Sequence, residues 1–193
     1  MALLLASASA IRRSMLADAG VEFEVSPAQV DEAREKSRHS DPEAIATALA
    51  RAKAVKVSQQ HFGDWVIGSD SVASIDGRLF DKPADRTQAR EHLRSFSGKT
   101  MLLTSAVAIA RAGKVEWSTC DCARLTVRNL SEAFIEAYLE AEWPDVGYCV
   151  GVFRLEGRGV QLFESIDGSF FTILGMPLLP LLGALRERGL VPS

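Results

Sequence analysis

Apolar and polar positions change their spacing from one segment of the chain to the next, and each spacing predicts one kind of element. A run of three leucines, Leu3–Leu5, predicts a short buried strand. Apolar residues on one face of the next segment predict a helix over residues 10–19. Ser9 is placed to cap that helix and Gly20 to end it. The chain therefore opens with a strand that runs directly into a helix.

Strand and helix patterns alternate along the rest of the chain, and the polar segment 26–41 predicts a loop. Strand patterns lie at residues 21–25, in a hairpin with an Asp-Gly turn over 64–83, in two long strands joined at Ala112-Gly113 over 100–127, and at 160–166. Helical patterns lie at residues 42–60, 86–97, 132–142 and 177–189. This order predicts an α/β fold with a mixed sheet flanked by helices.

Composition and charge argue against several classes of partner. Hydrophobic residues make up 47% of the 193 residues and charged residues 24%, which is ordinary for a soluble globular protein. The net charge of −3 gives no support to a nucleic-acid partner or an anionic membrane, although a local basic pocket for a phosphorylated small molecule is compatible with it. No apolar run approaches the ~18–20 residues of a membrane span.

The opening segment and the cysteines bear on where the protein works. The opening apolar run is shorter than that of a secretory signal, and its arginines follow the run instead of preceding it. A transit peptide would be longer and would not lead directly into a capped helix. The three cysteines, Cys120, Cys122 and Cys149, lack Cys-x-x-Cys spacing and predict reduced thiols. We therefore expect a cytoplasmic protein.

The first strand-to-helix junction carries the strongest chemical signal. A helix N-terminus offers free N–H groups and a partial positive charge. Ser7 and Ser9 add hydroxyl donors, and Arg12 and Arg13 add guanidinium groups that suit phosphate oxygens. Neighbouring helical residues point about 100° apart, so one of the two arginines can be idle. These residues alone leave two interpretations open, a phosphate cradle or a capped surface helix with solvated arginines.

Four ionisable residues elsewhere are candidates for the same chemistry. Asp70 follows the apolar strand start WVIG, where a buried carboxylate is costly unless it meets a cation or a hydrogen-bond donor. An aspartate after a strand also forms turns, so this position alone does not show whether Asp70 belongs to a site or to a turn. Lys53 lies mid-helix in LARAKA, Lys82 precedes a proline in DKP, and Glu32 lies in the polar loop. Each of these three can equally be a solvated charge.

Two common site types are excluded by their spacing. FSGKT at residues 96–100 ends like a P-loop, but Leu93 stands where that motif needs its first glycine, and a strand pattern follows. The three histidines are scattered without the spacing of a zinc site. A Walker-type nucleotidase and a zinc enzyme are therefore not expected.

Several short motifs occur together in the order and spacing of one family. They are LASASAIRRSML, VDE, LARAKA, IGSDSV, DKP, FSGKT, GRGVQLFESIDGSF and LGMPLLPLL. Over residues 3–188 the chain resembles the Maf family of nucleoside triphosphate pyrophosphatases, also called septum-formation inhibitor proteins. Each motif is short, but the motifs taken together are specific for this family. The chain departs from the family's usual GKP, because Asp81 precedes Lys82.

The resemblance implies one domain over residues 1–193, with two lobes around a cleft as in the inosine triphosphatases, and a homodimer. It implies hydrolysis of a nucleoside triphosphate to the monophosphate and pyrophosphate, with Mg²⁺ or Mn²⁺ as cofactor. By position, Asp70 corresponds to the proton acceptor, and Glu32 joins it on the metal side. The residues on the phosphate side are Ser7, Ser9, Arg12, Lys53 and Lys82, to which the cradle argument adds Arg13.

Three positions separate the two substrate branches of the family. In the 7-methyl-GTP branch they look like Trp, Gln and Glu, and in the dTTP/UTP branch like Arg, Thr and Gln. Here they are Ile11, Ser71 and Glu156. Glu156 matches the first branch and suits the N–H groups and positive ring of a methylated guanine, Ser71 is closer to the second, and Ile11 fits neither. We expect 7-methyl-GTP as substrate; the alternatives are a dTTP/UTP pyrophosphatase or a non-catalytic nucleotide-binding regulator of cell division.

Overall fold

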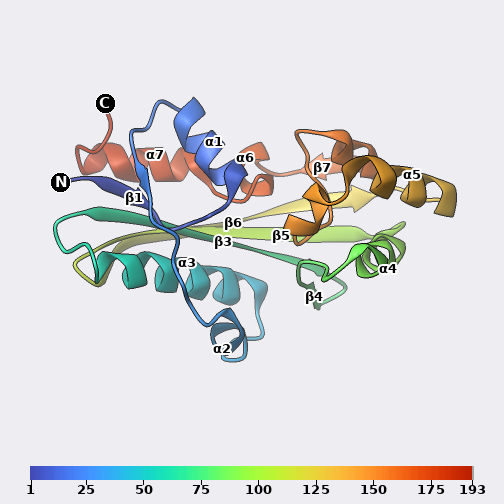
Figure 1. Cartoon of the computed structure of the whole chain (residues 1–193), viewed down its shortest axis with the longest axis horizontal. Coiled ribbons are helices and arrows are strands. Elements are labelled where there is room, and N and C mark those ends of the chain that lie inside the picture. Colours follow the sequence, from blue (N-terminus) through green and yellow to red (C-terminus); the bar gives the residue numbers. More distant parts are fainter. Residues whose placement is uncertain (193) are drawn as a thin grey trace. The chain divides into compact units, whose positions relative to one another are not determined.

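Residues 1–192, which the computed structural model describes, form an α/β fold around a seven-stranded mixed sheet (Figure 1). The strands are β1 (Leu3–Leu5), β2 (Glu24–Val25), β3 (Trp65–Ile75), β4 (Arg78–Phe80), β5 (Thr100–Arg111), β6 (Lys114–Val127) and β7 (Phe163–Asp167). Their order is β2-β1-β3-β5-β6-β7, with β4 paired to β3. β1 is parallel to β2 and β3, whereas β3–β4 and β6–β7 are antiparallel. The predicted α/β fold with a mixed sheet is confirmed.

Helices precede or follow most of these strands along the chain. The α-helices are α1 (Ala10–Asp18), α2 (Glu32–Lys36), α3 (Pro42–Ser58), α4 (Arg86–Phe96), α5 (Glu132–Glu142), α6 (Phe170–Ile173) and α7 (Leu178–Glu187), and the short 3₁₀ turns are η1 (Asp145–Tyr148) and η2 (Arg158–Leu162). Within residues 1–192, none of these helices has the length and apolar character that a membrane crossing needs.

The chain divides into two compact units. Unit 1 comprises residues 1–71, 104–121 and the described chain from 169 onward, and unit 2 comprises residues 72–103 and 122–168. The strands β3, β5 and β6 each begin in one unit and end in the other. The two lobes with a cleft that the family resemblance implies stay a prediction.

The core of unit 1 lies between its part of the sheet and the helices α1 and α7. Leu5, Leu16, Ile67, Leu181 and Leu185 are fully buried there. Figure 1 shows α1 and α7 on one side of β1 and α3 on the opposite side. Burial of such aliphatic side chains contributes about 1.5–3 kcal/mol each, so the two layers hold the first strand and its flanking loop in place.

Helix α3 packs against β3 with almost no space between the two backbones. A Cβ atom at Gly68 would lie 2.2 Å from the carbonyl oxygen of Ala50 and 2.5 Å from the amide nitrogen of Ala54. The helix starts at Pro42, as predicted, with the Asp41 carboxylate accepting a hydrogen bond from the Ala44 amide at 2.9 Å. This close approach of α3 to β3 brings the middle of the helix over the residues that follow Gly68.

Ion pairs join α4 and α5 in unit 2. Arg94 contacts Glu132 at 2.7 Å, and Arg90 pairs with Glu136. Hydrogen bonds from these arginines hold the pKa of both glutamates below its ordinary value. Ser131 caps α5 as predicted, accepting from the Phe134 amide at 3.2 Å. The pairs follow helical spacing on both elements and therefore align the two helices.

Several expectations from the sequence were wrong in detail. The predicted loop 26–41 contains α2, which has no buried residue and is capped by Asp31; without an apolar face it gave no periodic signal. The predicted strand 21–25 shortens to β2, and η2 replaces the first part of the strand 160–166. The short helix α6 was not expected. Ser9 stands at the N-cap of α1, but in the described structure its side chain makes no capping hydrogen bond.

Replacing Gly68 with alanine tests the close approach of α3 to β3. We expect Gly68→Ala to lower the free energy of unfolding by about 3 kcal/mol, because the new methyl group would overlap backbone atoms that cannot move independently. Urea denaturation measures this loss. The matched control is Gly63→Ala, where a Cβ atom meets nothing within 4 Å; equal stability losses in the two variants would contradict the packing argument.

Candidate active site

The centre of the candidate site is the ammonium group of Lys53. Lys53 Nζ lies 2.6 Å from Asp70 Oδ1 and 2.7 Å from Glu32 Oε1. The three side chains come from α3, β3 and the first residue of α2. Three of the residues predicted for one site are therefore brought into direct contact by elements that are distant in the sequence.

Asp70 is a buried carboxylate whose charge needs compensation. It is 7% exposed on β3, between the buried Ser69 and the half-buried Ser71. An ionised carboxylate in such a place is costly unless it is paired, and Lys53 supplies the pair. Glu32 is more exposed than Asp70, with 47% of its side chain accessible. Glu32 therefore reaches Lys53 from the solvent side, whereas Asp70 approaches it from the sheet.

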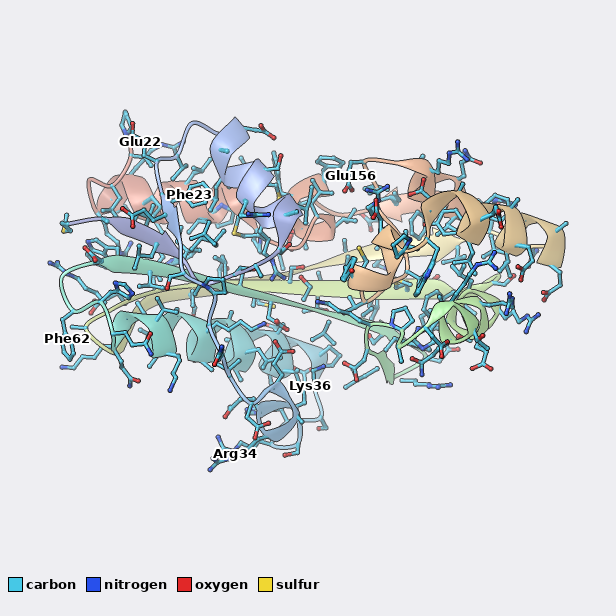
Figure 2. All side chains as sticks on the ribbon, viewed as in Figure 1. Glu22, Phe23, Arg34, Lys36, Phe62 and Glu156 are labelled. Atoms are coloured by element: carbon cyan, nitrogen blue, oxygen red, sulfur yellow. The ribbon has the colours of Figure 1, made fainter. Side chains whose placement is uncertain are left out.

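The Asp31 cap places Glu32 at the site. Asp31 Oδ1 accepts a hydrogen bond from the Arg34 amide at 3.0 Å, which starts α2 at Glu32. Figure 2 labels Arg34 and Lys36 on this same short helix. The VDE motif thus combines a helix cap with the acidic residue that contacts Lys53.

The chemistry of the donor set suits a hard divalent cation. Asp70 and Glu32 present carboxylate oxygens on either side of one positive charge, and Mg²⁺ typically binds one or two carboxylates together with substrate phosphates and water. Residues 1–192 contain no group of three or more His, Cys, Asp and Glu side chains arranged to hold a metal. A metal bound by these two carboxylates would therefore need further oxygen ligands from substrate and water.

Arg12 is fixed next to this pair by protein acceptors. Its Nε donates to Gly175 O at 2.9 Å, Nη1 to Ser69 O at 3.0 Å and Nη2 to Ser71 Oγ at 3.0 Å. Burial lowers the pKa of Arg12, and the charges of Asp70 and Glu32 act in the opposite direction. Because Ser69 and Ser71 flank Asp70 in sequence, the guanidinium contacts the residues on both sides of that carboxylate, through the backbone of Ser69 and the side chain of Ser71.

The remaining predicted residues of unit 1 lie around the start of α1. Ser7 is buried, and its Oγ accepts a hydrogen bond from the Ser9 amide at 3.2 Å. Ile11 is half-buried, whereas Arg13 is exposed. The two neighbouring arginines therefore differ as their helical spacing suggests: Arg12 turns toward the sheet and Arg13 toward solvent.

Lys82 and Glu156 belong to unit 2, where both act on the half-buried thiol of Cys149. Burial raises the pKa of Cys149 to about 11, with Glu156 adding to the rise and Lys82 opposing it. Both Lys82 and Glu156 are exposed, and Figure 2 labels Glu156 on the loop between η1 and η2. Unit 2 therefore places a cation and a carboxylate close to the same thiol.

Sequence reasoning missed the residues that hold the Glu156 loop. Glu142 is 7% exposed and accepts a hydrogen bond from Arg154 Nη2 at 3.0 Å, and Arg154 Nη1 also contacts Asp145 at 3.0 Å. These interactions raise the pKa of Arg154, the hydrogen bond to Glu142 being the main cause. A Cβ atom at Gly159 would lie 2.4 Å from Arg154 O. The glycines of EGRG were the available signal, because they let the loop fold closely around Arg154.

Comparison with known proteins places the chain in a family. A family model described as Maf-like protein matches residues 2–188. The chain belongs to the Maf family. It is 47% identical over 191 residues to a nucleoside triphosphate pyrophosphatase of Bradyrhizobium diazoefficiens, covering 98% of this chain and 95% of that protein. Among other Maf relatives, it is 45% identical over 195 residues to a 7-methyl-GTP pyrophosphatase of Rhizobium meliloti, covering 99% and 98%, and 45% identical over 193 residues to one of Rhizobium etli, covering 98% and 97%.

Removing the Lys53 ammonium tests whether it compensates Asp70. We expect Lys53→Met to lower the free energy of unfolding by about 1–3 kcal/mol at pH 7, because a buried carboxylate loses its hydrogen-bonded cation. Denaturant titration with circular dichroism measures the change. The control is Lys56→Met on the exposed face of the same helix, and a loss as large as that of Lys53→Met would contradict the special role of Lys53.

Proposed function

We propose that this Maf protein hydrolyses a nucleoside triphosphate to the nucleoside monophosphate and pyrophosphate with the help of a divalent metal ion. The observation that carries the proposal is the contact of Lys53 with both Asp70 and Glu32, beside the half-buried Arg12. The pyrophosphatase relatives described above support the same reaction. A homodimer belongs to the proposal on the strength of the family resemblance alone, and a cytoplasmic location on the reduced thiols expected from the cysteine spacing.

In this reaction a water molecule attacks the α-phosphorus, the bond to the bridging oxygen breaks, and pyrophosphate leaves with that oxygen. Asp70 is the group we assign to orienting the water and accepting its proton. Lys53 engages Asp70 Oδ1, so we assign the second oxygen, Oδ2, to the water. Lys53 thereby keeps the carboxylate in one orientation, which is a condition for a general base to act at a fixed distance.

The charge that develops on the leaving pyrophosphate has to be offset. Arg12 lies next to Asp70 and supplies a permanent positive charge, and Lys82 is assigned to the phosphate side from the DKP motif. Mg²⁺ or Mn²⁺, held by Asp70 and Glu32, would add Lewis-acid charge stabilisation. Positioning and electrostatics account for most of phosphoryl-transfer catalysis, so the residues need no covalent nucleophile among them.

For the nucleobase we propose 7-methyl-GTP, and Glu156 is the residue that supports this choice. Its carboxylate is exposed on a loop that Arg154 and Glu142 hold to α5, and a carboxylate can accept the N–H groups of a methylated guanine and offset its positive ring. Relatives named 7-methyl-GTP pyrophosphatase support the same choice. The dTTP/UTP alternative is favoured by one observation, the hydroxyl of Ser71 where that branch carries threonine.

The amide variant of Asp70 tests the catalytic assignment. We expect Asp70→Asn to lower kcat at least ~100-fold, the usual scale for loss of a general base, while nucleotide binding persists. Pyrophosphate release with Mg²⁺ or Mn²⁺ is the measurement, and Asp76→Asn in the exposed hairpin turn is the control. If the wild-type protein released no pyrophosphate from a broad panel of triphosphates, the enzymatic function would be disproved and a regulatory nucleotide-binding role favoured.

A substitution at Glu156 tests the choice of base. We expect Glu156→Gln to lower the ratio of kcat/KM for 7-methyl-GTP to that for UTP about tenfold or more, because a hydrogen bond to a charged group is lost. Steady-state kinetics on 7-methyl-GTP, GTP, UTP and dTTP give the ratio, with Glu164→Gln on β7 as the matched control. A wild-type preference for UTP or dTTP would overturn the assignment.

A further inference from the structure

A line of hydrogen bonds in unit 1 runs from Arg12 through the hydroxyl groups of Ser71 and Ser105 to Thr172 O. Arg12 Nη2 lies 3.0 Å from Ser71 Oγ, Ser71 Oγ lies 2.8 Å from Ser105 Oγ, and Ser105 Oγ lies 2.8 Å from Thr172 O. Ser105 is fully buried on β5, and Thr172 is fully buried on α6. The line therefore connects Arg12 on α1 with two strands of the sheet and with a helix near the end of the chain.

The direction of the hydrogen bonds along this line follows from counting protons. A serine hydroxyl carries one hydrogen. Thr172 O can only accept, so Ser105 donates its hydrogen to Thr172 O. Ser71 must then donate to Ser105. In the competing arrangement Ser105 would donate to Ser71, and Ser71 would donate to Gly175 O over 3.3 Å. That contact is longer than the 2.8 Å bond from Ser105 to Thr172 O that it would replace. The order is therefore Arg12 to Ser71 to Ser105 to Thr172 O.

This order limits what Ser71 can do for a substrate. Its single hydrogen is committed to Ser105, so its hydroxyl has no hydrogen left to donate to a nucleobase. Its oxygen accepts from Arg12 Nη2, and that bond fixes one edge of the guanidinium. Within the described residues, three of the five guanidinium N–H groups bond to Gly175, Ser69 and Ser71, and two remain to point at phosphate oxygens.

The other end of the line is anchored, so it can hold Arg12 in one orientation. Thr172 Oγ1 donates to Asp121 Oδ2 at 2.5 Å, which fixes the residue whose carbonyl ends the line. Gly175 O accepts from Nε of the same guanidinium, and a Cβ atom at Gly175 would lie 3.4 Å from Arg12 Nε and 3.3 Å from Ser71 Oγ. The guanidinium is thus held by a glycine carbonyl and by a neighbouring serine whose own direction is set by Ser105.

We propose that Ser105 is a positioning residue for triphosphate binding: through Ser71 it orients Arg12, so that residue 71 acts on the phosphates and not on the base. The inference rests on the proposed function, in which Arg12 binds the triphosphate. It assigns a task to Ser105, a residue that touches no substrate, and gives Ser71 a role different from the base contact that the family branches suggest.

The test uses a ligand that has phosphates but no base. Binding of inorganic tripolyphosphate with Mg²⁺ is measured by titration calorimetry for the wild type, Ser71→Ala, Ser105→Ala and the double variant. Each single variant is expected to bind about five- to tenfold more weakly, the scale of one lost hydrogen bond. The double variant should bind no more weakly than either single one, because both changes break the same line. Wild-type affinity in Ser105→Ala, or additive losses in the double variant, would overturn the proposal.

A buried serine elsewhere in unit 1 is the control for simple loss of packing. Ser58 is fully buried, with Oγ bonded to Val55 O at 3.0 Å, and we expect Ser58→Ala to leave tripolyphosphate affinity unchanged. If Ser105→Ala does not fold, Ser105→Cys, which keeps the size of the side chain but donates a much weaker hydrogen bond, takes its place in the tripolyphosphate titration. Equally weak binding in Ser58→Ala would assign the effect to general destabilisation and reject the positioning role.

A second readout separates phosphate action from base recognition. Ser71→Ala should lower kcat/KM by the same factor for 7-methyl-GTP, GTP and UTP, leaving their ratios within about twofold of wild type, since a common phosphate contact is weakened. A change confined to one base would show that Ser71 contacts the base and would overturn the inference while leaving the pyrophosphatase function intact. Failure of the function itself is distinguishable, because the wild type would then release no pyrophosphate.

Discussion

One ammonium group held between two carboxylates determines how the candidate site is built. Lys53 can reach Asp70 because α3 lies against β3 with only the hydrogen of Gly68 between their backbones. A buried Asp70 without that cation would be costly, so the packing of a helix on a strand and the ionisation of a carboxylate depend on each other. The same lysine draws in Glu32 from a short helix that has no buried residue of its own.

A second set of interactions explains why three polar residues follow Gly68 on β3. Ser69 Oγ shares its single hydrogen between Ala106 O and Gly175 O. Ser69 O accepts from Arg12, and Ser71 Oγ is hydrogen-bonded to both Arg12 and Ser105. Every one of these groups is satisfied by a partner from another element of unit 1. Because an unpaired buried polar group is costly, this stretch of β3 is held in one conformation, and Asp70 with it.

The sequence predicted the parts of this structure that have strong local signals. The helix that begins at Pro42 and the long strands carry apolar periodicity, and Arg12, Lys53 and Asp70 lie in motifs that a family resemblance identifies. The short helix α2 gave no such signal, because its residues face solvent and it owes its start to the Asp31 side chain. The contacts of Gly175 and Ser105 could not be predicted either. Gly175 lies in the LGMPLLPLL motif, but the motif does not show that its carbonyl accepts a hydrogen bond from Arg12. Ser105 is an ordinary residue of its strand, and only the fold brings it to Ser71.

The two units differ in how their polar residues are held. In unit 1 the groups around Asp70 are tied to backbone carbonyls and to one another, so a phosphate chain would meet donors whose directions are already set. In unit 2 the Glu156 loop depends on one buried carboxylate, Glu142, which holds Arg154. Under the proposed function, variation in that loop would change the group offered to a nucleobase without altering the contacts of Asp70 and Arg12 within unit 1. This separation is a physical reason why one family can keep one reaction and differ in the base it accepts.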